Sequence, residues 1–386
     1  MDSVVVSKPG VFLGKTSERL VVRGPRPRVD FVDGEPQLTL PFSVPAPPSL
    51  SVVTSDGTRK PPQPLRRLGE GAQRAKQEQI ELSLFRISEI IVTGSGVTLS
   101  TDLIEECCER GIRLAFLRPN GQPFAMISSP MLTATVVTRR AQMAAYGDER
   151  GATIARTFVK GKLGNQAALL KYFGKYKKAI APGDFEMLAG VVRSIVALRR
   201  DVDRAAGATV DELRGALLAI EGSAGRHYWN GVRTLLAGHA SFDAREHRGA
   251  VDPVNAALNY GYGVLYSQIW GAVMNAGLEP FAGFLHVDRP GKPSLVLDLI
   301  EEFRQPIVDR AIIALLTKGG DMAMRGGLLT DESRRLVAGA VLERLEGEAT
   351  LRGRRYRVKS IVQIQARSLA TMLRGGAPYR PFAFKW

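Results

Sequence analysis

Acidic side chains and one histidine stand out from apolar surroundings in the second half of the chain. Glu221 lies in an apolar stretch with helical spacing, and Asp298 and Glu301 lie three residues apart in another, downstream of His286. Residues three apart in a helix share one face. Carboxylates on an apolar helix are costly to bury unless a cation meets them. That cation is either a divalent metal ion or the guanidinium of a nearby arginine.

The residue types favour Mg²⁺ or Mn²⁺ if a metal is bound. Carboxylate oxygens suit Mg²⁺, and an imidazole nitrogen among the ligands makes Mn²⁺ well tolerated. A divalent ion next to a phosphate indicates phosphoryl transfer, because the ion can polarise a phosphoryl oxygen and stabilise the leaving oxygen. The sequence has no glycine-rich loop with a Walker lysine, so nucleotide hydrolysis is not supported. Glu302 falls to the side of the acidic pair, where a basic residue could pair with it.

The histidines differ in their surroundings. The chain contains four: His227, His239, His247 and His286. His239 and His247 lie in polar sequence and are interpreted as surface residues. His286 follows an apolar, strand-like run over 281–285 and precedes a basic turn.

Composition points to a polyanionic partner. The 386 residues include 53 Lys and Arg against 38 Asp and Glu, a formal net charge of +15. The two cysteines, Cys107 and Cys108, are adjacent, which excludes a disulfide framework and a spaced zinc site. Apolar runs are too short to span a bilayer and the N-terminus lacks a signal-peptide pattern, so we expect a cytoplasmic protein without membrane contact.

The first third of the chain is predicted to be a small β-rich domain over residues 1–130. Runs of β-branched residues at 3–6, 19–23 and 89–99 predict strands, and 101–110 has helical spacing. Residues 36–76 contain eight of the 22 prolines, so this segment is interpreted as an inserted loop. The small domain closes near residue 130.

The remainder, 136–386, is predicted to be a larger all-α catalytic domain, which makes the fold class α+β. The clearest helix has Asp252 as N-cap and Pro253 at its first position and should be buried on all sides. Another begins near Ser294, and Pro306 is expected to kink or break it at Gln305. Residues 350–386 carry nine basic residues and no acidic one, with helical spacing that predicts a folded helix facing DNA.

The chain resembles the CRISPR adaptation integrase family, CRISPR-associated protein one, from about residue 90 to the C-terminus. The shared order of several motifs makes this resemblance specific. They are Arg139-Arg140-Ala141-Gln142, Lys162 with Asn165-Gln166, Glu221-Gly222 with Tyr228, Asn259-Tyr260-Gly261-Tyr262, His286, Ser294-Leu295, Asp298-Leu299-Ile300-Glu301-Glu302-Phe303-Arg304 and Tyr379-Arg380-Pro381-Phe382.

The resemblance implies a role in antiviral defence through spacer acquisition. It implies a homodimer formed largely through the β-domains, and two such dimers assembled on a dimer of CRISPR-associated protein two that binds prespacer DNA. The family's metal ligands correspond to Glu221, His286 and Glu301, with Asp298 as a supporting carboxylate. Many members have aspartate at the position of Glu301, so whether Asp298 or Glu301 is the third direct ligand is open.

The implied reaction is a metal-dependent transesterification, in which a prespacer 3′-hydroxyl attacks a phosphodiester at the edge of a CRISPR repeat. In this interpretation three cations that flank His286 and Glu301 are candidates for holding DNA phosphates or developing charge: Arg289, Lys292 and Arg304. Each could equally be an ordinary surface cation. Two alternatives remain. One is a metal-dependent endonuclease that hydrolyses branched DNA at the same site. The other is a non-catalytic DNA-binding scaffold whose carboxylates only form salt bridges.

Overall fold

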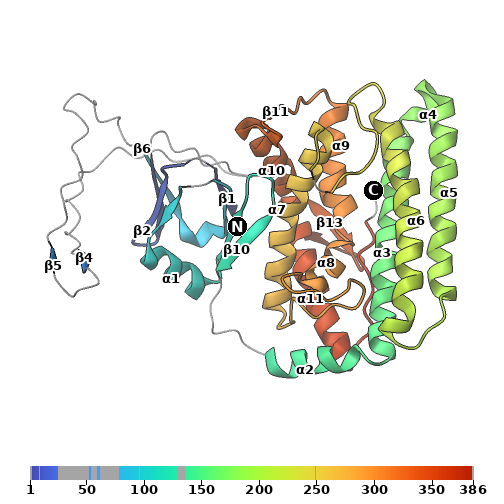
Figure 1. Cartoon of the computed structure of the whole chain (residues 1–386), viewed down its shortest axis with the longest axis horizontal. Helices are drawn as coiled ribbons and strands as arrows, with labels where there is room; N and C mark the ends of the chain where they lie inside the picture. Colours follow the sequence, from blue (N-terminus) through green and yellow to red (C-terminus); the bar gives the residue numbers. More distant parts are fainter. Residues whose placement is uncertain are drawn as a thin grey trace.

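Strands make up the first part of the chain and helices most of the rest, as the sequence predicts (Figure 1). The structure is a computed structural model that describes residues 2–7, 9–24, 52–53, 59–60, 78–94, 96–127, 135–247 and 249–384. Most of the proline-rich insert therefore lies outside the described residues. Within it, β4 (Val52–Val53) pairs with β5 (Arg59–Lys60).

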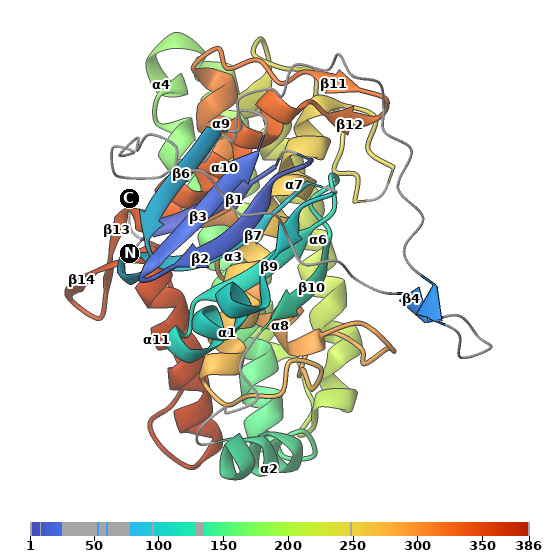
Figure 2. The ribbon, with the colours of Figure 1, turned by 90° about the vertical axis from the view of Figure 1, so that its left-hand side faces the viewer.

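Two four-stranded sheets form the β-rich part. One has the order β1-β7-β9-β10 and the other β6-β3-β2-β8. The strands of the first are β1 (Asp2–Val6), β7 (Ile87–Val92), β9 (Arg113–Leu117) and β10 (Pro123–Ile127). Those of the second are β2 (Phe12–Thr16), β3 (Arg19–Gly24), β6 (Glu78–Ser83) and β8 (Thr98–Leu99). Figure 2 shows these strands in front of the helical part.

Between the strands, a short 3₁₀ helix (Leu84–Arg86) precedes β7, and α1 (Thr101–Arg110) lies between β8 and β9. Valine, leucine and isoleucine side chains from both sheets and from α1 form one hydrophobic cluster, in which Leu13, Leu20 and Ile90 are fully buried. The helix predicted for 101–110 is confirmed, with Gly111 in the left-handed conformation at its end (φ 69°).

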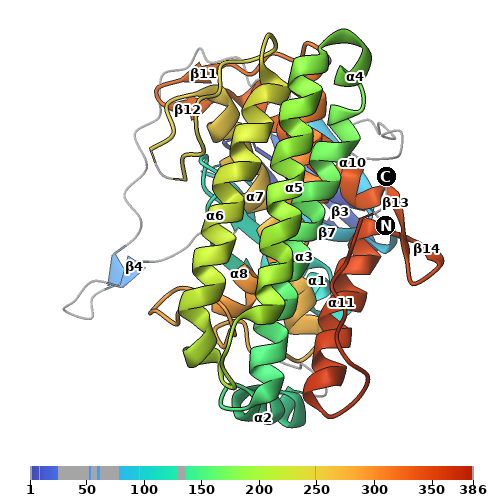
Figure 3. The ribbon, with the colours of Figure 1, turned by 90° about the vertical axis from the view of Figure 1, so that its right-hand side faces the viewer.

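The helical part surrounds one long buried helix, α7 (Pro253–Asn275). Around it lie α2 (Thr135–Ala145), α3 (Glu149–Gly174), α4 (Lys177–Ile180), α5 (Pro182–Arg204), α6 (Val210–Leu236), α8 (Ser294–Ile300), α9 (Arg310–Thr317), α10 (Asp331–Glu346) and α11 (Val358–Leu373). Two hairpins complete it, β11 (Met324–Arg325) with β12 (Leu328–Leu329) and β13 (Glu348–Leu351) with β14 (Arg354–Arg357). Figure 3 shows α3, α5 and α6 side by side on the face away from the sheets.

The sequence predicted α7 correctly. The Asp252 side chain accepts a hydrogen bond from the Asn255 amide at 2.8 Å, and Pro253 occupies the first turn. Glycines let the turn between β9 and β10 pack directly onto this helix. A Cβ on Gly263 would lie 1.6 Å from the Gly121 carbonyl oxygen, so only glycine fits there. The buried Glu89 of β7 also contacts α7, accepting hydrogen bonds from Ser267 and Gln268.

The region after α7 differs from the prediction. Residues 281–285 form a loop, not a strand, because their amides bind side chains and not a neighbouring strand. Helix α8 ends at Ile300, five residues before the predicted break at Gln305. Pro306 lies inside a π-helical segment, η2 (Arg304–Asp309), which leads directly into α9.

Candidate active site

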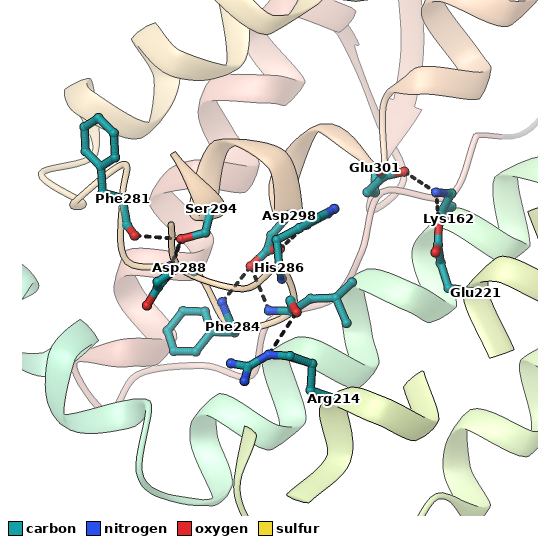
Figure 4. Close-up of polar contacts among 12 residues, drawn as sticks. Lys162, Arg214, Glu221, Phe281, Phe284, His286, Asp288, Ser294, Asp298 and Glu301 are labelled. Atoms are coloured by element: carbon teal, nitrogen blue, oxygen red, sulfur yellow. Dashed lines mark hydrogen bonds and ion pairs between the residues drawn. The ribbon is translucent and has the colours of Figure 1, made fainter. Parts of the chain in front are cut away.

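A buried lysine joins two of the candidate carboxylates. Lys162, in the middle of α3, donates a hydrogen bond to Glu221 of α6, and its Nζ lies 2.7 Å from Glu301 Oε2 at the end of α8 (Figure 4). Burial lowers the pKa of Lys162, but the charges of Glu301 and Glu221 outweigh it and leave the pKa raised. Three helices far apart in sequence thus meet at one ammonium group between two carboxylates.

Glu301 is held ionised in a buried position. Burial opposes ionisation, yet the positive charges of Arg304, Lys162 and His286 lower the pKa of Glu301 to about 2. Arg304 Nε lies 3.4 Å from Glu301 Oε1. Glu301 Oε2 is buried at ion-pair distance from Lys162 but receives no well-directed hydrogen bond. The site therefore contains an ionised carboxylate oxygen with remaining capacity to bind a cation.

Asp298 has a different task from Glu301. Its fully buried carboxylate accepts hydrogen bonds from the backbone amides of Phe284 (2.6 Å), Leu285 (3.0 Å) and His286 (2.9 Å). Asp298 Oδ1 also lies 2.7 Å from Nδ1 of the His286 ring. With Nδ1 held by Asp298, the His286 ring is fixed in orientation and its Nε2 is the nitrogen left for a ligand.

Other side chains fix the loop that carries His286. Gln142 of α2 donates hydrogen bonds to the carbonyls of Glu279 (3.0 Å) and Ala282 (2.7 Å). Arg214 of α6 donates to the Leu285 carbonyl at 3.2 Å. At the other end, Ser294 Oγ accepts from the Gly283 amide and lies 2.6 Å from both the Phe281 carbonyl and Asp288 (Figure 4).

Gly283 is required in this loop by the space available. A Cβ at this position would lie 2.7 Å from both Asp298 Oδ2 and the Ser294 carbonyl carbon. The loop can therefore wrap closely enough around Asp298 to present three consecutive amides. This geometry explains why the segment is a loop although its composition resembles a strand.

The four candidate catalytic residues thus form two adjoining pairs. Glu221 and Glu301 are joined through Lys162, and His286 is bound to Asp298. The His286 charge contributes to the low pKa of Glu301, so the two pairs are electrostatic neighbours. Within the described ranges, no three His, Cys, Asp or Glu side chains are already close enough together to hold a metal ion.

Behind Arg304 lies an aromatic and acidic network. The Arg304 guanidinium lies 4.8 Å from the centre of the Tyr262 ring. Tyr262 and Tyr228 both donate hydrogen bonds to the buried Asp309, the latter at 2.6 Å. Burial raises the pKa of Asp309 to about 6. This network helps to hold Arg304 beside Glu301.

Comparison with known proteins identifies the family. The model of the family described as CRISPR associated protein Cas1 matches residues 70–343. This chain belongs to the Cas1 family. It is 36% identical over 312 residues to CRISPR-associated endonuclease Cas1 1 of Archaeoglobus fulgidus, covering 78% of this chain and 90% of that protein. A relative with the same name in Thermus thermophilus is 34% identical over 326 residues, covering 82% of this chain and 95% of that protein.

Solved structures share the Cas1 fold. A casposase bound to an integration product matches with a TM-score of 0.74 at 20% identity, covering 99% of this chain and 93% of the other. A Cas1 protein from Thermotoga maritima matches with a TM-score of 0.67 at 19% identity, covering 99% and 100%. In the described part of the chain, every helix is too short or too polar to cross a membrane.

Glu302 does not pair with a basic residue, in contrast to the sequence-based interpretation. This fully buried carboxylate accepts hydrogen bonds from the Tyr379 hydroxyl (2.6 Å), the Phe382 amide (2.9 Å) and Gln365 (3.1 Å). Burial raises the pKa of Glu302 to about 7. Asn165 of α3 binds the Glu302 and Phe382 carbonyls. In this Cas1 chain, Glu302 and Asn165 thus anchor the C-terminal segment around Tyr379 and Phe382 against α3.

The small residues after Glu221 leave space beside the helix. A Cβ at Gly222 or Gly225 would meet no atom within 4 Å. The α6 surface beside Glu221 is therefore open rather than packed.

The predicted phosphate-binding cations differ in their surroundings. Arg289 is exposed, Lys292 is half-buried in the same turn, and Arg304 contacts Glu301 and Tyr262.

The sequence did not show the part that two residues play near the site. Lys162 was noted only as part of a motif, although it bridges the carboxylates. His247 is exposed, as the sequence predicts, but it lies close to the site. Partial burial together with the charges of Arg245, Arg304 and Lys162 lowers the pKa of His247 to about 4. His247 lines a pocket of about 720 Å³ between α7, the β9–β10 turn and the β11–β12 hairpin, which Arg304 also lines.

Proposed function

We propose that this Cas1-family protein is an integrase of CRISPR adaptation, which joins prespacer 3′-hydroxyl ends to phosphodiesters at the CRISPR repeat. The observation that supports it most is the pair of carboxylates, Glu221 and Glu301, converging on a cation beside a histidine oriented by Asp298. The likeness to a CRISPR-associated endonuclease and to a casposase bound to an integration product supports the same class of phosphoryl-transfer chemistry.

The residues suit a divalent metal ion. Glu221, Glu301 and His286 offer two carboxylates and one imidazole, a donor set that Mg²⁺ and Mn²⁺ accept. Glu301 Oε2 is buried without a well-directed hydrogen bond, and Lys162 Nζ stands between the two carboxylates as a single positive charge. When bound, the ion would activate the attacking hydroxyl and stabilise charge on the leaving oxygen. Asp298 is then a positioning residue and Glu301 the third direct ligand, because every Asp298 oxygen already accepts hydrogen bonds.

The reaction conserves phosphodiester bonds. The prespacer 3′-oxygen forms a bond to the target phosphorus while the bond from that phosphorus to the repeat strand's 3′-oxygen breaks. The proton of the attacking hydroxyl ends on the released 3′-oxygen. Arg304, held by Glu301 and Tyr262, lies where it can bind a non-bridging phosphate oxygen, and Arg289 and Lys292 can bind neighbouring phosphates.

The expected partners are double-stranded and branched DNA, a second copy of this chain, and CRISPR-associated protein two. The net charge of +15 supports DNA binding. A solved complex named Cas6-RT-Cas1–Cas2 contains a chain that matches with a TM-score of 0.67, at 17% identity and over 36% of its length. The expected location is the cytoplasm.

A strand-transfer assay tests the proposal. A labelled oligonucleotide is incubated with a repeat-bearing plasmid and Mn²⁺, with and without chelator. Covalent attachment of the label to the plasmid is expected with metal and lost with chelator or in Glu221→Gln. Glu186→Gln, which replaces an exposed carboxylate on α5, is the matched control and should keep strand-transfer activity.

The same assay distinguishes two alternatives. Hydrolysis of branched DNA would release shortened fragments with no joined product, since water would replace the 3′-hydroxyl at the same carboxylates. A non-catalytic scaffold would bind DNA but give neither product, and Glu221→Gln would change nothing. Either result would refute the integrase proposal.

A further inference from the structure

A second pocket lies at the end of the helical part, apart from the carboxylate site. It measures about 530 Å³ and lies where α4, α9 and α10 meet the ends of α3 and α6. None of Lys162, Glu221, His286 or Glu301 lines it. The segment η2 runs from Arg304 at the carboxylate site to Arg310, which begins α9 and lines this pocket.

The pocket concentrates positive charge. Arg310, Arg344, Lys177 and Lys318 line it, whereas Glu343 is the only acidic lining residue. Lys177 is 3.2 Å from Asp184 outside the lining, and Lys318 is exposed to solvent. The two arginines are the lining cations that the structure places next to each other. Burial, together with the charge of Arg310, lowers the pKa of Arg344 to about 10. Two guanidinium groups are therefore held near each other against their mutual repulsion.

Aromatic side chains hold these guanidinium groups in place. Arg310 lies 5.6 Å and Arg344 5.4 Å from the centre of the same Phe384 ring. Arg310 also lies 5.0 Å from the centre of the Tyr172 ring. Although burial would raise the pKa of Tyr172, the charges of Arg310 and Lys175 lower it, which is the signature of a strongly positive field. The arginines are preorganised, so little side-chain entropy is lost when an anion binds.

The lining also includes apolar side chains that are open to solvent. Tyr176 is 59% exposed and Ile180 79% exposed, and both line the pocket. Exposed aromatic rings next to fixed cations are the elements of nucleotide binding, where the base stacks on a ring and the phosphate meets guanidinium groups. A volume of about 530 Å³ falls within the range of small-molecule sites.

We propose that this pocket binds one nucleotide, with its phosphate at Arg310 and Arg344 and its base against Tyr176. The ligand is a nucleoside monophosphate, either free or as one unit of a single DNA strand. A nucleotide fits better than an acidic peptide because a carboxylate chain would use the arginines but not the exposed ring. This site goes beyond the proposed integrase activity and does not depend on it.

Calorimetric titration in the presence of chelator tests the site without any need for catalysis. The probes are thymidine monophosphate, thymidine, inorganic phosphate and a 5′-phosphorylated thymidine tetranucleotide. The monophosphate should bind at least about tenfold more tightly than thymidine or phosphate, since only it uses both the arginines and the Tyr176 ring. Equal binding of phosphate and monophosphate would overturn the proposal. Tighter binding of the tetranucleotide than of the monophosphate indicates a strand, and equal binding indicates a free nucleotide.

Matched variants locate the binding. Arg310→Met with Arg344→Met should weaken monophosphate binding by about tenfold or more, and the exposed Tyr176→Ala by about threefold or more. Arg193→Met with Arg200→Met removes the same charge from exposed positions on α5 and should change affinity by less than about twofold. If both double variants weaken binding equally, the effect is only net charge and the pocket is refuted.

Photocrosslinking gives a readout that folding defects in the double variant cannot imitate. 5-Bromodeoxyuridine monophosphate is irradiated with the wild-type chain, and the modified peptide is identified by mass spectrometry. Modification within residues 172–180 is expected. Modification confined to other segments, or displacement of the probe by polyglutamate but not by thymidine monophosphate, would contradict the proposal.

Discussion

Asp298 and Glu301 are three residues apart but differ in what their oxygens can do. Replacing Asp298 by asparagine places an amide NH₂ against backbone N–H donors of the His286 loop. We expect Mn²⁺ affinity to fall by about 10- to 100-fold and the free energy of unfolding by about 1–3 kcal/mol. Calorimetric Mn²⁺ titration and urea unfolding measure both.

Glu301→Gln provides the comparison. It removes a direct ligand, so excess Mn²⁺ should restore strand transfer in Asp298→Asn but not in Glu301→Gln. If excess Mn²⁺ restored strand transfer only in Glu301→Gln, Asp298 would be the direct ligand and Glu301 the positioning residue.

Lys162 provides a second test at the level of single residues. Lys162→Met keeps the length of the side chain but leaves two carboxylates without their bridging charge. Removing one partner of a buried ion pair costs about 3–5 kcal/mol. In the presence of chelator, Lys162→Met should therefore unfold at a lower urea concentration than the wild type. Mn²⁺ should bind the variant more tightly than the wild type, because the ion no longer competes with the Lys162 ammonium group for the two carboxylates.

Lys160 lies on α3 like Lys162, but it pairs with the exposed Asp203 of α5. Lys160→Met should therefore change neither property appreciably. Weaker Mn²⁺ binding by Lys162→Met than by the wild type would show that the lysine does not stand in for the ion.

The sequence indicated Glu221 and Glu301 because carboxylates in apolar helices need an explanation, and His286 because it follows an apolar run and precedes these carboxylates. It could not indicate Lys162, since a lysine in a long helix reads equally well as a surface residue until the partners on α6 and α8 are placed. Likewise, His247 lies in polar sequence and becomes informative only when folding brings Arg304 and Lys162 near it.

At the level of elements, local rules succeeded where they governed the backbone. The cap formed by Asp252 and Pro253 fixes the start of α7 through contacts within four residues, so sequence sufficed. The strand prediction for residues 281–285 was wrong because the amides of Phe284 and Leu285 bind Asp298, which lies 14 and 13 residues further along the chain. No local propensity carries that information. Pro306 is accommodated in η2, where the usual helical hydrogen-bond pattern is already changed.

The C-terminal segment gives the pH dependence of the fold. The pKa of Glu302 rises from 4.5 in the unfolded chain to about 7 in the folded protein. Between these values the folded protein keeps a proton that the unfolded chain releases, so stability falls as pH rises. The slope from this group is at most about 1.4 kcal/mol per pH unit. Burial also raises the pKa of Asp309 to about 6, so this group lowers stability with rising pH over a lower pH range.

Glu302→Gln should therefore flatten the fall in stability between pH 5 and 7. Urea unfolding at pH 5, 6 and 7 measures the slope, which is independent of any constant loss of stability from the substitution. Glu186→Gln, at an exposed position, should leave the slope unchanged. An identical slope in Glu302→Gln and the wild type would mean that Glu302 is ionised throughout this range.

For the whole molecule, the two parts are joined by a contact that tolerates little change. The Gly121–Gly263 approach and the buried Glu89 fix the first sheet against α7. The β-rich part also contains the sheets through which the proposed homodimer would form. Composition predicted two cores and a basic surface, but the contact between them depends on backbone distances that composition does not encode.

The net charge of +15 predicts that DNA binding depends steeply on salt. Each phosphate neutralised by a lysine or arginine adds about −0.9 to the slope of log affinity against log salt concentration for duplex DNA. If Arg289 and Lys292 contact phosphates beside the His286 loop, their joint replacement by alanine should make this slope less steep by about two and weaken binding equally for repeat and unrelated duplexes.

Fluorescence anisotropy between 50 and 300 mM salt measures the slope. Arg204→Ala at the exposed end of α5, with its arginine paired to Asp201, serves as control and should leave it unchanged. A loss confined to the repeat duplex would instead assign Arg289 or Lys292 to base recognition. An unchanged slope in the double variant would place the phosphates elsewhere on the surface, and the target strand would then have to reach Glu301 without crossing this turn.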